Sequence, residues 1–251
     1  IYAEKPLRDY TKVIQYCDEV KEDGFDLVDD FSDLFGMNAA GTDAKMRNTK
    51  ESILEAQFTS GAGNWCTWMF GRDLVNWNNN FTWAKWVTPS RDLISAFKQE
   101  GDEVRFKESI VYYDCNWSNY YPSDNYPFMY KCRSANSSII KYRYADVLLL
   151  KAEALIMQDT PDLEGAADII DEVRDRAKLG ALPTSVRSNK NVLLNALLKE
   201  RRLELAFEGQ RWFDLVRLDK VEEVMNAVYA KDSGRKAQIY TFDKNSYRLP
   251  I

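Results

Sequence analysis

Tryptophan and asparagine are concentrated in one part of the sequence. Six of the seven tryptophans lie between residues 65 and 117, and the stretch GNWCTWMFGRDLVNWNNNFTW, residues 63–83, interleaves them with asparagine. A flat aromatic ring can bury the apolar C–H face of a sugar, and an amide can both donate to and accept from the surrounding hydroxyl groups. The candidate ligand-binding residues are therefore Asn64, Trp65, Trp68, Trp77, Asn78, Trp83, Trp117 and Tyr120. The alternative is that these rings only hold together loops that lack regular structure.

A second concentration of chemically active side chains is ERRLELAFEGQRWFDLVR, residues 200–217. On a helical wheel, Arg201 falls in the middle of a face formed by Leu194, Leu198 and Leu205. An uncompensated buried charge is strongly destabilising, so Arg201 must be paired. We predict a structural clamp in which Arg201 is neutralised by carboxylates of the same helix and the next one, namely Glu204, Glu208 and Asp214. This stretch is expected to join helices, and the ligand site to lie elsewhere.

The composition argues against several classes of chemistry. The 251-residue chain contains no histidine, which removes Ser-His-Asp and Cys-His nucleophiles, histidine bases and histidine-ligated metals. Its four cysteines lack CxxC spacing, and whether Cys115 and Cys132 form a disulfide stays open. The net charge of -5 argues against a nucleic-acid partner bound through its phosphates. We expect no catalytic residue, no bound metal and no cofactor.

The periodicity of the apolar residues predicts a mainly α-helical scaffold that must position these groups. Helices are expected over residues 6–21, 142–157, 160–180, 191–207 and 210–230. Thr160 is the expected N-cap of the third, and the last two are broken near Gly209. ESILEAQF, residues 51–58, is a short strand or a helix end. Successive helix pairs with small residues at their contacts favour a tetratricopeptide-like helical-repeat scaffold.

The pattern divides the chain into segments of one domain. Residues 1–60 are expected to form a helical-repeat segment that continues from a missing N-terminal half, and residues 61–141 a loop-rich aromatic ligand-binding segment. Residues 142–230 are expected to form the C-terminal helical repeats, and residues 231–251 a truncated C-terminal tail. One helix is expected inside the loop-rich insertion, in PSRDLISAFKQEG. Long irregular loops on an ordered scaffold are uncommon unless they are functional, which favours the second segment as the ligand-binding one.

Three motifs in the C-terminal part resemble those of the SusD/RagB family. YRYADVLLLKAEAL, VRDRA and LLKERRLELAFEGQRWFDLVRL follow one another in the family's order. DEVKEDGFDLVDDFSDLFG and ESILEAQF, further upstream, fit the same family less specifically. The resemblance covers nearly the whole chain and is to the C-terminal portion of the family. We expect the family's N-terminal portion, with its lipidated cysteine and first helical repeats, to be missing here.

The resemblance implies a surface glycan-binding lipoprotein of the outer membrane of Bacteroidetes. Such proteins capture oligosaccharide or polysaccharide and deliver it to a SusC-like TonB-dependent transporter, which is the implied partner. Some relatives handle peptides, which is the alternative ligand class. A carboxylate-based glycoside hydrolase is the remote alternative, because it needs two carboxylates across a cleft and the acids of the aromatic segment form no recognisable motif. For a neutral glycan, binding should be nearly independent of salt.

Overall fold

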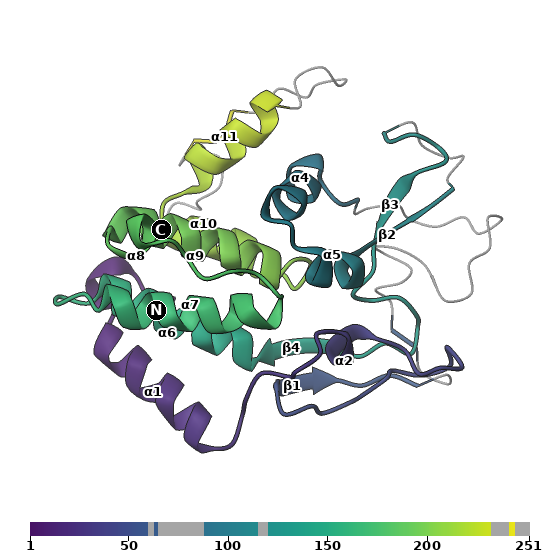
Figure 1. Ribbon diagram of the computed structural model, residues 1–251, viewed down its shortest axis with the longest axis horizontal. Helices are drawn as coiled ribbons and strands as arrows, with labels where there is room; N and C mark the ends of the chain where they lie inside the picture. Colours follow the sequence, from purple (N-terminus) through teal and green to yellow (C-terminus); the bar gives the residue numbers. More distant parts are fainter. Residues whose placement is uncertain (60–62, 65–87, 115–119, 232–240, 244–251) are drawn as a thin grey trace. The chain divides into compact units, whose positions relative to one another are not determined.

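The computed structural model describes residues 1–59, 63–64, 88–114, 120–231 and 241–243 (Figure 1). Its internal contacts divide the chain into two compact units. The larger unit contains residues 9–208 and Ile1, and the smaller contains residues 2–8 and 209–251. Within the described ranges, none of the helices combines the length and the apolar character that a membrane crossing would need.

A stack of helices forms the body of the larger unit. It contains α1 (Tyr10–Glu22), α6 (Tyr144–Met157), α7 (Leu163–Arg176) and α9 (Lys190–Glu204). Helix α6 packs against each of the other three (Figure 1). It can be enclosed in this way because it is apolar almost all round, and Ala145, Leu149 and Ala152 are fully buried. The mainly α-helical class predicted from the sequence is confirmed.

The ends of these helices are set by local side chains. Helix α7 begins at Leu163, and the carboxylate of Asp162 accepts a hydrogen bond from the Gly165 amide at 2.9 Å. The predicted cap at Thr160 was therefore wrong, because an aspartate two residues later satisfies the first turn. The short helix α8 (Thr184–Arg187) leads to α9, whose N-cap is Asn189. Downstream of α9, Gly209 adopts a φ of 84°, which fits the predicted break.

Two short antiparallel strand pairs complete the larger unit. Strand β1 (Ser52–Ala56) pairs with β4 (Ile139–Arg143), so ESILEAQF contains a strand. Strand β4 leads directly into α6, and this connection brings Arg143 to the start of that helix. Strand β2 (Ile110–Tyr113) pairs with β3 (Tyr126–Met129), with Tyr113 opposite Tyr126. The short helix α2 (Ser32–Phe35) lies within residues 26–36, which contain four aspartates.

Helix α4 (Arg91–Glu100) is the helix predicted in the loop-rich segment, and α5 (Glu103–Ser109) follows it. The Ser90 hydroxyl caps α4 by accepting from the Leu93 amide at 3.1 Å, and Gly101 ends it with a φ of 69°. The buried side of α4 belongs to an apolar cluster that includes Leu203 of α9.

The smaller unit contains η1 (Lys5–Leu7), α10 (Arg211–Arg217) and α11 (Val221–Lys231). The single helix predicted over residues 210–230 was wrong, because the chain turns between α10 and α11, where Asp219 adopts a φ of 55°. Phe242 holds this unit together. Its ring lies 6.3 Å from that of Trp212 and 5.5 Å from that of Tyr229, measured between centroids.

Candidate functional site

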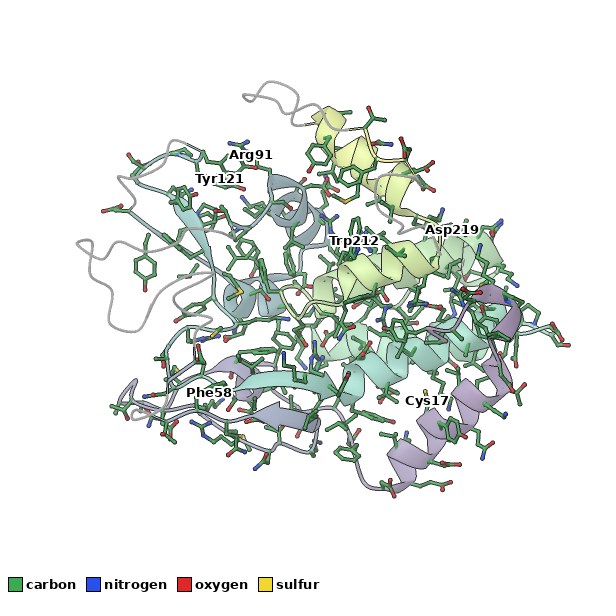
Figure 2. All side chains as sticks on the ribbon, turned by 180° about the vertical axis from the view of Figure 1, so that it is seen from behind. Cys17, Phe58, Arg91, Tyr121, Trp212 and Asp219 are labelled. Atoms are coloured by element: carbon green, nitrogen blue, oxygen red, sulfur yellow. The ribbon has the colours of Figure 1, made fainter. Side chains whose placement is uncertain are left out.

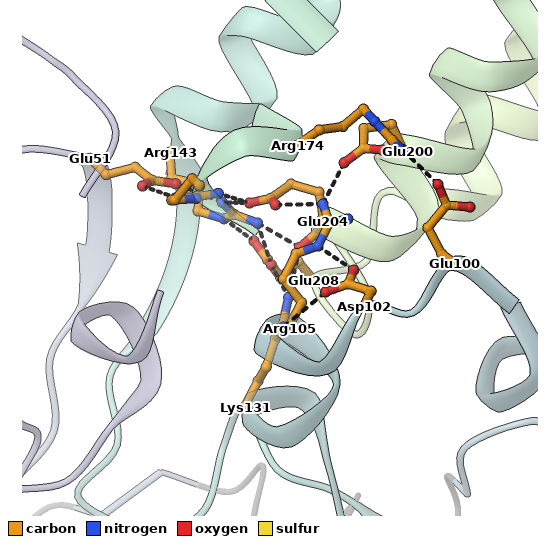
Figure 3. Close-up of polar contacts among 11 residues, drawn as sticks. Glu51, Glu100, Asp102, Arg105, Lys131, Arg143, Arg174, Glu200, Glu204 and Glu208 are labelled. Atoms are coloured by element: carbon orange, nitrogen blue, oxygen red, sulfur yellow. Dashed lines mark hydrogen bonds and ion pairs between the residues drawn. The ribbon is translucent and has the colours of Figure 1, made fainter. Parts of the chain in front are cut away.

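The charged residues at the end of α9 lie in a buried ion network (Figure 3). At its centre, the carboxylate of Glu204 is fully buried and contacts three guanidinium groups. They belong to Arg105 of α5, Arg143 of β4 and Arg176 of α7, so one side chain joins elements that are far apart in the sequence. Burial by itself favours the neutral acid, but the three arginines together hold the pKa of Glu204 well below its usual value.

Other carboxylates surround the same cations. Glu51 accepts from Arg143 and from Arg176, both at 2.6 Å. Glu208 accepts from the Arg143 Nε at 2.7 Å. Asp102 and Glu200 both pair with Arg105, at 2.5 and 2.6 Å. With Lys131, these residues make up the buried ion network, namely Glu51, Asp102, Arg105, Lys131, Arg143, Arg176, Glu200, Glu204 and Glu208.

The structure corrects the pairing predicted for the clamp. Arg201 is buried as expected, but it pairs with Asp146 of α6 at 2.8 Å. Glu204 and Glu208, which we had assigned to Arg201, pair with the cations of the buried ion network. Asp214 belongs to the smaller unit and pairs there with Arg217 at 2.7 Å. A helical wheel shows which face a side chain occupies, but it cannot show which distant cation arrives there.

Lys131 is the member of this network with the most unusual environment. Its ammonium donates to Glu208 at 2.6 Å and to the backbone carbonyl of Glu204 at 2.8 Å. It also lies 4.7 Å from the centre of the Phe35 ring. Burial lowers the pKa of Lys131 to about 8, and Glu208 only partly offsets this effect.

We expect Lys131 to make the stability of the protein rise with pH. The unfolded chain holds this proton up to an ordinary pKa of 10.5, whereas the folded protein releases it near pH 8. Because the unfolded state binds more protons in that interval, the folded state gains stability as the pH rises through it. The difference in unfolding free energy between wild type and Lys131→Met should therefore increase by roughly 2 kcal/mol from pH 7 to pH 10. Urea unfolding followed by circular dichroism measures it.

The control for this experiment is Lys107→Met, which changes an exposed lysine on α5. Only a rise in the free-energy difference with pH that Lys131→Met shows in excess of Lys107→Met is assigned to the burial of Lys131. If the differences for the two variants changed equally with pH, the folded protein would not lower the pKa of Lys131.

Of the predicted ligand-binding residues, the structure describes Asn64 and Tyr120. Trp65, Trp68, Trp77, Asn78, Trp83 and Trp117 lie outside the described residues. Asn64 is only 5% exposed, and both hydrogens of its amide are used, by the backbone carbonyls of Ser134 and Ser137 at 3.1 and 2.7 Å. This geometry gives Asn64 a structural role, fixing the turn at residues 134–137, in place of the predicted ligand contact.

Tyr120 is 37% exposed and belongs to a cluster of aromatic rings. Its ring packs edge-on against Tyr121, with the centroids 5.0 Å apart, and Tyr121 packs in the same way against Tyr126. The guanidinium of Arg91 lies over both Tyr120 and Tyr121, 4.9 and 4.8 Å from the ring centres. Figure 2 shows Arg91 and Tyr121 next to each other. The Tyr121 hydroxyl donates to the Pro89 carbonyl at 2.7 Å, which ties this cluster to the start of α4.

A hollow of about 450 Å³ lies beside this cluster. It is bounded by α4, by Tyr112 of β2 and by Tyr121, Pro122 and Asn125. The volume falls within the range of roughly 300–1,000 Å³ that is common for small-ligand sites. Two residues of the hollow's lining, Arg91 and Lys98, are not among the candidates predicted from the sequence. The helical spacing within PSRDLISAFKQEG was a signal for them, because they are two turns apart.

The family of this chain follows from a comparison with known protein families. The model of the SusD family matches residues 121–249, which is half of the chain. The chain belongs to the SusD family. A SusD-like protein of Formosa agariphila, P38, is 43% identical over 99 residues, which cover 37% of this chain and 19% of that protein. The family membership inferred from the three motifs is confirmed.

Solved structures of SusD-like proteins share the fold. A SusD superfamily protein from Bacteroides vulgatus superposes with a TM-score of 0.62 at 18% identity, covering 92% of this chain and 54% of that one. Surface glycan-binding protein A from Bacteroides thetaiotaomicron, in complex with laminarihexaose, gives a TM-score of 0.62 at 19% identity, covering 86% and 51%. The chain thus spans about half the length of these two proteins. The tetratricopeptide-like scaffold predicted from the sequence is confirmed.

Proposed function

We propose that this chain belongs to a surface glycan-binding protein of a SusC/SusD-type nutrient uptake system. The observation that carries the proposal is membership of the SusD family, and the fold is shared with a laminarin-binding SusD-like protein and with surface glycan-binding protein A, which has been solved in complex with laminarihexaose. The concentration of tryptophan and asparagine between residues 64 and 83 supports it, as does the tyrosine-lined hollow beside α4. Both offer the flat rings and the hydrogen-bonding groups that a saccharide needs.

In the proposed mechanism, the protein captures an oligosaccharide and makes no change to its bonds. It then delivers the ligand to a SusC-like TonB-dependent transporter, at the outer membrane, where an N-terminal lipid anchors it. The helical stack and the buried ion network support α4 and α5, so that the side chains that α4 presents to the hollow lose less conformational freedom on binding.

Calorimetric titration of the full-length protein with a panel of oligosaccharides tests the binding. We expect saturable binding of at least one glycan, without new reducing ends after prolonged incubation. New reducing ends would assign the protein to the glycoside hydrolases, and binding of oligopeptides in place of glycans would assign it to the peptide-handling relatives. Co-purification with the co-expressed SusC-like transporter tests the partner, and separation of the two during size-exclusion chromatography would argue against it.

A further inference from the structure

One wall of the hollow is a single face of α4. Arg91, Ser95 and Lys98 follow one another at i, i+4 and i+7, so they form a row about two turns long. Gln99 lies beside this row, and its amide donates to the Ser95 hydroxyl at 3.0 Å. The wall therefore presents two cationic side chains together with groups that hydrogen-bond in both directions.

The acidic residues of α4 are engaged elsewhere. Asp92 pairs with Arg202 at 2.7 Å. Glu100 pairs with Arg174 at 2.7 Å and also with Lys199. Lys98, in contrast, has no ion-pair partner in the part of the chain that the structure describes. Of the described residues that line the hollow, none is an aspartate or a glutamate. The described lining of the hollow therefore carries two positive side chains, Arg91 and Lys98, and no negative one, although the whole chain carries a net charge of -5.

Arg91 is held in a defined position on this wall. Its guanidinium lies over the rings of Tyr120 and Tyr121 and donates to the backbone carbonyl of Tyr120. Because these contacts already restrict the long Arg91 side chain, it loses less conformational freedom when a ligand binds. The planar guanidinium matches the oxygen geometry of a carboxylate or a sulfate, which a neutral sugar lacks.

We propose that the hollow beside α4 is an anion subsite that binds a sugar unit carrying a carboxylate or a sulfate group. The inference rests on the proposed function, because it assumes that the ligand is a saccharide. Arg91 and Lys98 hold the anionic group, and Tyr121 offers a ring to the apolar face of the sugar. Gln99 and Asn125 offer amides to its hydroxyl groups. Binding is then sensitive to salt, which differs from the salt-independent binding expected for a neutral glycan.

The test uses matched tetrasaccharides that are neutral, that carry uronate carboxylates or that carry sulfates. Each is titrated against the full-length wild type, Lys98→Glu and Lys107→Glu, at low and at high sodium chloride. Lys98 lines the hollow, whereas Lys107 is an exposed lysine of the next helix and is not part of the lining. Because both variants replace a lysine by a glutamate, they change the net charge of the protein equally. We expect Lys98→Glu to weaken binding of an acidic tetrasaccharide about tenfold or more and Lys107→Glu to change it less than about twofold.

The possible outcomes separate the subsite from the proposed function. A preference for uronates or for sulfates that is lost in Lys98→Glu and reduced by salt supports the subsite and identifies its anionic group. Salt-independent binding of the neutral tetrasaccharide, equal in all three proteins, overturns the subsite and leaves the proposed function standing. Failure of the wild type to bind any saccharide overturns both. Arg91→Lys, which keeps the charge and loses the planar fork, should bind the acidic ligand more weakly than wild type while melting within a few degrees of it.

Discussion

Replacing Glu204 by glutamine should lower the unfolding free energy by at least about 3 kcal/mol. Glutamine keeps the shape of the side chain but leaves Arg105, Arg143 and Arg176 without the buried carboxylate that all three contact. Those guanidinium groups have no route to water, since each is almost fully buried, and a buried charge with a missing partner is strongly unfavourable. Urea unfolding monitored by circular dichroism measures the loss.

The matched control is Glu164→Gln on α7, which makes the same chemical change in an ion pair at the surface. The Glu164 side chain is 73% exposed and pairs with Arg187, so its loss should remain within the ~0–1 kcal/mol typical of such pairs. Glu208→Gln should be intermediate, because Glu208 contacts two cations and its side chain is 10% exposed. If Glu204→Gln does not fold, Glu208→Gln still tests the network. Equal unfolding free energies of the Glu208→Gln and Glu164→Gln variants would contradict the prediction that the buried ion network stabilises the fold.

Alanine substitution of the tryptophans in the loop-rich segment should divide them into two groups. A ring that stacks on a sugar should behave as a hot spot, and its loss should cost about 2 kcal/mol or more of binding free energy. Affinity should then fall more than tenfold while the melting temperature is kept. A ring that only packs a loop should lower the melting temperature and leave the affinity close to wild type. The variants are Trp65→Ala, Trp68→Ala, Trp77→Ala and Trp83→Ala, each titrated with the best glycan of the panel.

The described residues supply the controls for this series. Asn64→Ala should destabilise the protein without changing affinity in the folded fraction, because the Asn64 amide is bonded to two backbone carbonyls. Tyr120→Ala should weaken binding if the ligand occupies the hollow, because the ring supports Arg91. If all four tryptophan variants bind as wild type does, the tryptophan segment is not the ligand-binding surface. The remaining candidates in this chain are then Trp117, Tyr120 and Tyr121.

The scaffold was largely predictable from the sequence because local patterns determine it. The apolar repeat of residues 142–157 predicted α6 to within two residues of its start and to its last residue. The helix expected within PSRDLISAFKQEG is α4, and the three motifs predicted the family that the comparison confirmed. The break between α10 and α11 was missed, because a turn that depends on a positive φ at an aspartate leaves no clear periodic signal.

The pairing of charges was not predictable in the same way. The sequence placed Arg201, Glu204 and Glu208 close together on one helix, and the simplest assignment paired them with one another. In the structure, Glu204 meets Arg105 and Arg143, which come from positions 99 and 61 residues away along the chain. Local periodicity carries no information about contacts at such separations.

The sequence by itself determined the class of fold, the family and the aromatic segment in which a saccharide site is expected. Only the tertiary structure decided that Asn64 is a buried support and that Arg91, Lys98 and Tyr121 line one hollow. The physical reason is that residue types and their spacing set helix faces and ligand chemistry. Which faces meet depends on packing between segments that are distant in sequence, and those contacts decide whether a polar side chain serves the core or the ligand.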